Sequence, residues 1–254
     1  MRRNWKIRIF IGLAIVAFAY IQRCTNKEEN PYTGRVQNIS MSTDQEIAIG
    51  LQSAPQIAQQ YGGLYPNDNY QAIVDQVGNK LVNNSIAKET PYKYEFHLLA
   101  DDQTINAFAL PGGQVFITYA LFSKLNEAQL AGVLGHEIGH VIGRHSAERI
   151  AEGNFWKTVS MGASVGADAG DIVGSIGQNT LLTNGREDEL ESDDLGVLFM
   201  LRSGYDPLEM IRVMEILKEA AGPNRVPEFK STHPDPDNRI EQIKSAIKKY
   251  ENQF

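Results

Sequence analysis

The longest apolar run of the chain lies close to its N-terminus, where Ile9 to Ile21 contains no charged residue. A basic segment precedes this run, and Gln22, Arg23 and Cys24 follow it. A basic segment, an apolar run and a polar stretch, in this order, are typical of an export signal or a membrane anchor. Because positively charged flanks stay in the cytoplasm, we predict that residues 1–24 form a signal or membrane anchor. The remainder is then extracytoplasmic, on the periplasmic side.

Two forms of this anchor fit the sequence: an uncleaved signal anchor, or a segment that is cleaved before Cys24 with lipid attached to that cysteine. The apolar run is shorter than the roughly 20 residues of a spanning helix. A lipoprotein signal, however, normally has a small residue where Arg23 stands. Cys24 is the only cysteine of the chain, which excludes an intrachain disulfide and a thiolate metal cage. The sequence leaves both forms open.

Beyond the anchor, the hydrophobic periodicity is first helical and then strand-like. After a polar linker, it predicts two helices, over residues 43–61 and 69–84. It then predicts three short strands, over residues 94–100, 107–110 and 114–118. Pro111-Gly112-Gly113 predicts a turn between the second and third strands. We expect a linker and N-terminal helix over residues 25–64 and one domain over residues 65–254.

The second half of the chain is predicted to be almost entirely helical. Asn126 is a helix cap, and four helices are expected, from residue 127 into the 140s and over 186–203, 206–221 and 235–250. Residues 158–185 are rich in glycine, alanine and serine, which fits either a tightly packed helix of small residues or a mobile flap over a cleft. The element order predicts an α+β fold, with a small, mostly antiparallel sheet packed on a predominantly helical body.

The sequence His136-Glu137-Ile138-Gly139-His140 matches the H-E-x-x-H pattern within an otherwise apolar helix. Residues four apart lie about 40° apart around a helix, so both imidazoles can bind one zinc ion. Glu137 lies beside the first ligand, where its carboxylate can take a proton from a zinc-bound water, whose pKa is about 7. These groups would be costly to bury without a partner. The motif therefore predicts a catalytic zinc with Glu137 as the base.

A catalytic zinc needs a third protein ligand, and two candidates follow the motif. His145 is one residue too early for the pattern H-E-x-x-H-x-x-G-x-x-H, and on a continuous helix it lies about 180° from His136. Glu189 and Asp193 lie four apart in an acidic segment. Glu189 can complete the zinc shell, and Asp193 can accept a hydrogen bond from a ligating histidine. A solvated acidic surface would give the same spacing, so the residues alone do not decide whether Glu189 is a zinc ligand or a surface carboxylate.

Four segments of the chain resemble the metallopeptidase family of HtpX, the C-a-a-X prenyl endopeptidases and BepA-like periplasmic quality-control proteases. They follow one another in the family's order over roughly residues 65–250. They are Asn106-Ala-Phe-Ala-Leu-Pro-Gly-Gly113, the H-E-x-x-H segment from Gly135 to Arg149, Arg186-x-x-Glu189-x-Glu191-x-Asp193-x-x-Gly196, and Thr232-His233-Pro234 with Arg239-Ile240. The third segment departs from the family pattern only at Ser192, where alanine is usual.

The resemblance implies a zincin-like fold of the gluzincin type that binds one zinc ion through His136, His140 and Glu189. It also implies that His233 lies near the metal, where it can donate to the developing oxyanion or cap the zinc in a resting state. Further implied roles are support by Arg239 and positioning of substrate by Asn106. The expected activity is endoproteolysis of misfolded or envelope proteins.

Charge and hydropathy narrow the remaining function classes. The whole chain carries −7 and residues 1–23 carry +5, so the remainder carries −12, which disfavours nucleic acid as a partner. A polytopic prenyl peptidase is disfavoured, because only the N-terminal segment is apolar enough to span a membrane. No helical repeat domain is predicted, and the oligomeric state is unknown from the sequence. The alternative to a protease is a membrane-tethered chaperone or scaffold that keeps zinc for stability.

Overall fold

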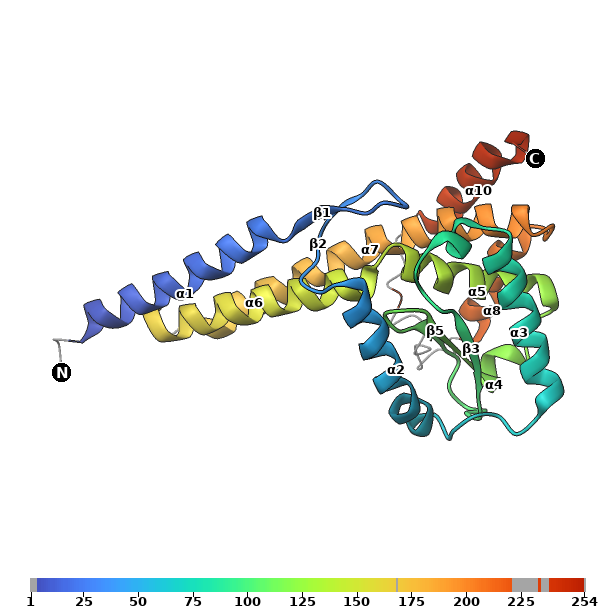
Figure 1. Ribbon diagram of the computed structural model, residues 1–254, viewed down its shortest axis with the longest axis horizontal. Helices are drawn as coiled ribbons and strands as arrows, with labels where there is room; N and C mark the ends of the chain where they lie inside the picture. Colours follow the sequence, from blue (N-terminus) through green and yellow to red (C-terminus); the bar gives the residue numbers. More distant parts are fainter. Residues whose placement is uncertain (1–3, 168, 221–232, 234–237, 254) are drawn as a thin grey trace. The chain divides into compact units, whose positions relative to one another are not determined.

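A computed structural model describes residues 4–167, 169–220, 233 and 238–253. The chain divides into two compact units (Figure 1). The first unit comprises residues 1–42 and 145–185, and the second comprises residues 43–144 and 186–254. Each unit therefore combines segments that are far apart in the sequence.

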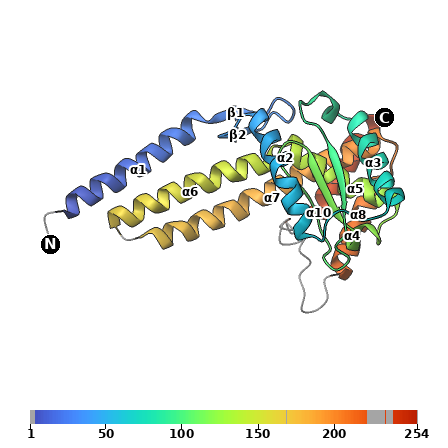
Figure 2. The ribbon, with the colours of Figure 1, turned by 60° about the horizontal axis from the view of Figure 1, so that its bottom comes forward.

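The first unit is built on a long N-terminal helix. Helix α1 (Trp5–Thr25) packs against α6 (His145–Ala167), and α7 (Gly170–Arg202) begins in the same unit (Figure 2). Strands β1 (Lys27–Glu29) and β2 (Val36–Asn38) form an antiparallel hairpin. At 21 residues, α1 is longer than its apolar run and is long and apolar enough to cross a membrane. The glycine-rich segment is helical in α6 and in the start of α7.

The second unit contains the small sheet and most of the core. Its strands are β3 (Glu95–Leu99), β4 (Ala107–Ala109) and β5 (Gln114–Thr118), in the order β3-β5-β4. Strand β4 pairs antiparallel with β5 through the predicted turn, whereas β3 pairs parallel with β5. The remaining elements are α2 (Thr43–Gln60), α3 (Asp68–Asn83), η1 (Ile86–Glu89), α4 (Tyr119–Phe122), α5 (Glu127–Ile142), the second half of α7, α8 (Leu208–Ala220), α10 (Arg239–Tyr250) and η2 (Glu251–Gln253).

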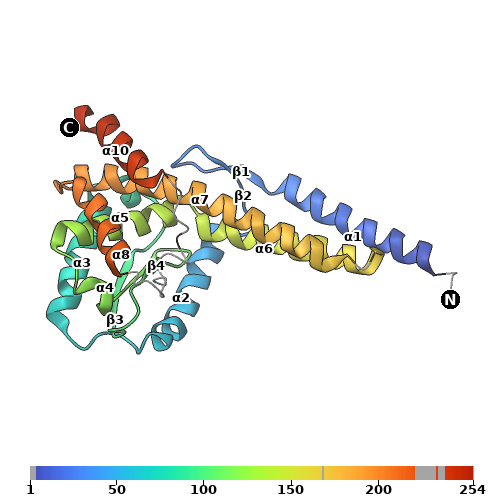
Figure 3. The ribbon, with the colours of Figure 1, turned by 180° about the vertical axis from the view of Figure 1, so that it is seen from behind.

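Helix α5 forms the centre of this unit. Asn126 and Gln129 form a capping box at its start, and every residue from Gln129 to Ile142 is buried. The α5 and α7 backbones approach closely, because glycines replace larger side chains: a Cβ on Gly139 would lie 3.0 Å from the Cα of Ser192. Figure 3 shows α7 running beside α5 in this unit. The H-E-x-x-H motif thus lies against the later helix that carries Glu189.

Helix α2 is fixed to the end of α5 by a buried ion pair. The Glu46 carboxylate accepts hydrogen bonds from Arg144, just after the C-terminus of α5, and from the hydroxyl of Tyr92, 3.0 Å away. The β4–β5 turn packs on the same part of α2, since a Cβ on Gly112 would lie 2.4 Å from the Cα of Ile47. Glu46 therefore connects α2 with Tyr92 and with the residue that follows the C-terminus of α5.

The α+β prediction is confirmed, and the three strands lie close to their expected positions. The helix expected over residues 186–203 is instead the second half of α7, which begins at Gly170. One of the two strand pairings in the sheet is parallel, where a mostly antiparallel sheet was expected.

On α3, the apolar residues Ile73, Val74, Val77 and Leu81 recur at helical spacing, which predicts one buried face. Val74, Val77 and Leu81 are buried as predicted, but the side chain of Ile73 is 41% exposed. Residue 73 lies at the edge of that face, where the same spacing is compatible with either environment.

Candidate metal centre

Three side chains from two helices converge inside the second unit. His136 and His140 lie one turn apart on α5, and their Nε2 atoms are 3.0 Å apart. Glu189 reaches them from α7, with Oε2 3.2 Å from Nε2 of His136 and Oε1 3.2 Å from Nε2 of His140. All three are buried. The predicted pair of histidines and the distant carboxylate are therefore brought together.

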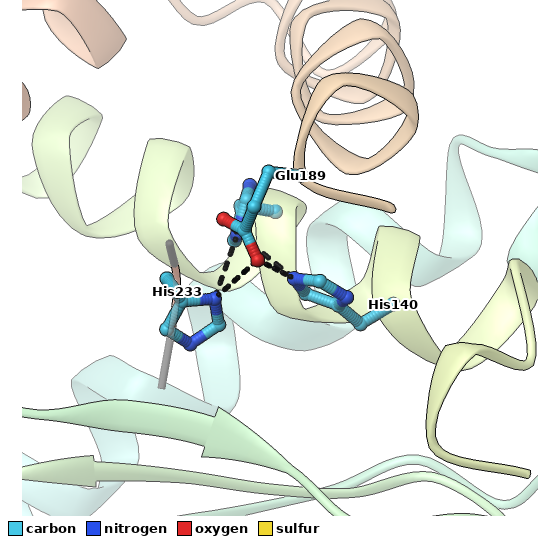
Figure 4. Close-up of side chains that lie close together, drawn as sticks. His140, Glu189 and His233 are labelled. Atoms are coloured by element: carbon cyan, nitrogen blue, oxygen red, sulfur yellow. Dashed lines mark hydrogen bonds and ion pairs between the residues drawn. The ribbon is translucent and has the colours of Figure 1, made fainter. Parts of the chain in front are cut away.

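His233 adds a fourth possible ligand to this cluster (Figure 4). Its Nδ1 lies 3.0 Å from Oε1 of Glu189 and 3.4 Å from Nε2 of His136. One atom each from His136, His140, Glu189 and His233 can be chosen so that all lie within 4.8 Å of one another. On its other side, Nε2 of His233 lies 3.2 Å from the backbone oxygen of Ala107 in β4.

Asp193 contacts His136 on the side of its ring opposite the shared centre, whereas Arg239 also reaches the centre itself, with an Nη atom 3.2 Å from Oε2 of Glu189. Oδ1 of Asp193 lies 2.8 Å from Nδ1 of His136. Arg239, the first residue of α10, donates to both oxygens of Asp193, with Nε 2.6 Å from Oδ2 and an Nη atom 2.9 Å from Oδ1. Burial would raise the pKa of Asp193, but Arg239 and the hydrogen bond from His136 lower it below its usual range. The ring of His136 is thereby held with Nε2 toward the centre.

Glu137 lies next to the cluster in a dry environment. It is fully buried, and its Oε1 is 3.5 Å from Nε2 of His233. Neither carboxylate oxygen has a hydrogen-bond partner among the residues that the structure describes. Burial raises the pKa of Glu137, and the charges of His233 and His136 oppose this only in part. A carboxylate with a raised pKa is a stronger base, which suits proton transfer.

The charges of the cluster fit a divalent cation. Burial alone would lower the pKa of His136, but Glu189 and the hydrogen bond to Asp193 raise it to about 9. Burial would likewise raise the pKa of Glu189, yet the surrounding histidines hold it well below its usual range. A buried carboxylate among three imidazoles thus attracts positive charge, as a divalent cation supplies. Two or three imidazoles with one carboxylate are also a donor set that zinc accepts.

Asn106 lies at the start of β4 and is fully buried. Its backbone N–H donates to Oγ1 of Thr118 at 3.1 Å, and its amide donates to the hydroxyl of Tyr61 at 3.3 Å. Its carbonyl oxygen accepts from the N–H of Thr118 at 3.0 Å. Because successive residues of an antiparallel strand point their backbone groups to alternate sides, Ala107 points its carbonyl away from β5, toward His233. The residue type of Ala107 gave no sign of this role.

His145, the alternative third ligand, is the first residue of α6 and is buried in the first unit. The described cluster of possible metal ligands contains Glu189 and not His145.

The sequence profile of peptidase family M48 matches residues 68–247, which include every residue of this cluster. The chain belongs to peptidase family M48. Among its M48 relatives, the β-barrel assembly-enhancing protease of Yersinia pestis is 32% identical over 231 residues, covering 85% of this chain and 46% of the relative. Its counterpart from Escherichia coli K12 is 30% identical over 91% of this chain and 48% of the relative.

A eukaryotic M48 protein is similar over almost the same length. The mitochondrial metalloendopeptidase OMA1 of Schizosaccharomyces pombe is 29% identical over 246 residues, covering 92% of this chain and 70% of that protein. The chain spans about half the length of the bacterial relatives it matches. The M48 match makes it a member of a metallopeptidase family with a candidate His/His/Glu/His metal centre, and polypeptides are the substrate class of that family.

Proposed function

We propose that this M48 protein is a zinc-dependent metalloendopeptidase that cleaves misfolded or envelope proteins outside the cytoplasm. The observation that carries the proposal is the convergence of His136, His140 and Glu189 at 3.0–3.2 Å from two separate helices. One zinc ion per chain would be held by these three side chains. When bound, zinc supplies Lewis-acid polarisation of the scissile carbonyl and acidification of a water molecule.

Glu137 is proposed as the catalytic base and then the acid. It takes the proton of the attacking water on a carboxylate oxygen and passes it to the leaving amine. Its burial and raised pKa support this role, because they favour proton uptake by the carboxylate. Asp193 is proposed to fix the ring orientation of His136, and Arg239 to hold Asp193, as their 2.6–2.9 Å contacts suggest.

His233 has two proposed roles, which an experiment separates. As an oxyanion donor, it stabilises the negative charge that develops on the carbonyl oxygen. As a cap, it occupies a ligand position of the metal in a resting state. Its position within reach of both Glu189 and the Ala107 carbonyl supports the cap, because there it also covers a backbone acceptor of β4. His233→Ala lowers kcat if the donor role holds, and raises activity and zinc exchange if the cap holds.

The substrate is proposed to bind as an extended strand beside β4, using backbone hydrogen bonds. Asn106 would contribute by fixing β4 to β5, so that the carbonyl of Ala107 stays directed toward the cluster. The proposed peptidase domain extends over residues 65–254, after an anchor at 1–24 and a linker and helix at 25–64. Membrane attachment through residues 1–24 and a periplasmic location accompany this proposal; the apolar helix α1 and the similarity to β-barrel assembly-enhancing proteases support it.

The decisive experiment compares the wild-type protein with Glu137→Gln for zinc content and for cleavage of casein or peptides. Glu137→Gln is expected to keep one zinc per chain and lose peptidase activity, because the amide cannot take a proton. Glu127→Gln, at an exposed position at the start of the same helix, is the matched control and should leave both unchanged. Full turnover by Glu137→Gln would refute the mechanism.

The second candidate function is a membrane-tethered chaperone that keeps zinc for stability. The dense packing of α5 against α7 around the cluster favours it, since a metal there would also join two helices. Zinc-loaded wild-type protein without chelator-sensitive cleavage, but with suppressed aggregation of an unfolded client, would support the chaperone over the protease.

A further inference from the structure

We propose that α1 stays in the mature protein as a helix of the first unit, and that α6 enters the membrane beside it. This inference does not depend on the proposed peptidase activity. It decides between the two forms of the anchor, because cleavage before Cys24 would remove every residue of α1 up to Arg23. It also gives the glycine-rich segment after the H-E-x-x-H helix a lipid environment.

Close backbone contact joins the two helices at one end. A Cβ on Gly12 would lie 2.6 Å from the oxygen of Gly162 and 2.8 Å from the Cα of Gly166. Gly162 and Gly166 are spaced four apart, so they lie on one face of α6. Small residues with this spacing let helix backbones approach inside membranes, where dispersion contacts rather than the hydrophobic effect drive association. A Cβ on Gly162 would lie 2.9 Å from the oxygen of Gly12, so substituting Gly162 would push the helices apart. A Cβ on Gly166 would lie 3.6 Å from the Cα of Gly12, which is an ordinary contact.

A polar and aromatic cluster joins the helices at the other end. Arg23 bonds the carboxylate of Glu152, whose side chain is only 4% exposed, and the indole of Trp156 donates to the same carboxylate at 2.8 Å. Tyr20 packs edge-on against Phe155, with ring centroids 5.2 Å apart. Removing α1 would take the cation from a buried carboxylate, which is a costly change. The contacts indicate a helix that belongs to the fold, not a removable signal.

The two contact regions also fix the depth of α6. Gly12 lies within the apolar run of α1, and α1 at 21 residues is about 31 Å long, which matches the roughly 30 Å hydrocarbon layer. Since Gly162 and Gly166 touch Gly12, they lie at the same depth when α1 crosses the membrane. The aromatic cluster around Trp156 then lies near the interface, where tryptophan and tyrosine are enriched.

The part of α6 beside Gly12 is chemically suited to lipid. Residues 158–167 contain no charged side chain. Two of their three hydroxyl groups bond within the helices: Thr158 donates to the oxygen of Asn154 at 2.9 Å, and Ser160 to the oxygen of Gly170 at 2.7 Å. Such internal bonds remove the cost of unsatisfied polar groups in hydrocarbon. Met161, whose side chain is 53% exposed, presents an apolar surface beside them.

The first test asks whether α1 is retained. Mass spectrometry of the wild-type protein, extracted from membranes, is expected to find peptides from Ile9–Arg23 still attached to the chain. An N-terminus at Cys24 that carries lipid would overturn the proposal. This measurement needs no variant, so it does not depend on whether a substitution folds.

The second test asks whether α6 lies in lipid. The full-length chain with Cys24→Ser carries one new cysteine, Met161→Cys or, as the control, Val36→Cys, whose position on β2 is 65% exposed. Each purified protein in liposomes is treated with N-ethylmaleimide, which reacts with the thiolate and therefore needs water. Val36→Cys should label, whereas Met161→Cys should label only after the liposomes are dissolved in SDS. Equal labelling of the two positions in liposomes would refute the membrane location of α6.

Discussion

The buried pair of Glu46 and Arg144 gives a quantitative test of how the metal helix is held. The side chains are 2% and 10% exposed, and Nε of Arg144 lies 2.9 Å from Oε1 of Glu46. In Glu46→Gln the shape is kept, but the guanidinium loses its counter-charge and meets an amide. Removing one partner of a buried pair typically costs 3–5 kcal/mol. We expect Glu46→Gln to lower the free energy of unfolding by about 3 kcal/mol, since the hydrogen bond from Tyr92 can remain.

An exposed pair in the same unit is the matched control. Nζ of Lys244 lies 2.9 Å from Oε1 of Glu241, but the side chains are 54% and 72% exposed. Solvent screens such a pair, and Lys244→Ala should cost less than about 0.5 kcal/mol. Because both ion pairs include an N···O distance of 2.9 Å, the difference in burial accounts for the different expected losses in the free energy of unfolding. Arg144→Gln and the double variant complete a cycle, in which the coupling should exceed about 2 kcal/mol. Glutamine keeps a Cβ at position 144, where φ is 55°, so backbone strain changes little.

The assay must report on the second unit. Both tryptophans, Trp5 and Trp156, lie in the first unit, so tryptophan fluorescence would follow the wrong part of the chain. In a Trp5→Phe, Trp156→Phe background, near-ultraviolet circular dichroism reports on the tyrosines, and the stacked pair Tyr65–Tyr119, with ring centroids 4.1 Å apart, makes it sensitive to the second unit during urea unfolding of the full chain. A loss below about 1 kcal/mol in Glu46→Gln, or an additive cycle, would refute the idea that this pair fixes α5.

Further predictions concern the metal centre itself. Glu189→Ala should lose most bound zinc in metal analysis while exposed Glu187→Ala keeps it; equal zinc in both would remove Glu189 from the ligand set. Asp193→Asn should weaken zinc binding by about 10- to 100-fold in a chelator competition, because the ring of His136 loses its acceptor; unchanged affinity would contradict this. Gly139→Ala should also weaken it, since the added Cβ meets Ser192 and displaces α7; wild-type zinc affinity would show that the helices tolerate the shift.

The sequence predicted the residues of the metal centre better than it predicted the helix packing that brings them together. Two histidines four apart on an apolar helix must point to one side, so their convergence follows from helix geometry alone. Glu189 was one of several carboxylates in an acidic segment; its spacing from Asp193 made it a candidate ligand, and the resemblance then favoured it. Glu189 reaches the two histidines because α7 approaches α5 closely where Gly139 faces Ser192. That contact joins positions more than fifty residues apart, and no local pattern encodes it.

The same reasoning explains why the glycine-rich segment allowed two interpretations. Glycine weakens an isolated helix, so a mobile flap was a reasonable expectation for the glycine-rich residues 158–185. In the structure, Gly162 and Gly166 face Gly12, and the space they leave is occupied by the backbone of α1. A residue that lowers local helix propensity is thus what permits the contact between helices. Composition cannot separate a packed helix from a mobile flap, because the partner helix lies 150 residues away, in a segment that the sequence alone assigned to a signal or membrane anchor. The retention of α1 and the packing of α6 as a helix therefore depend on each other, and finding residues 9–23 in the mature protein would support both.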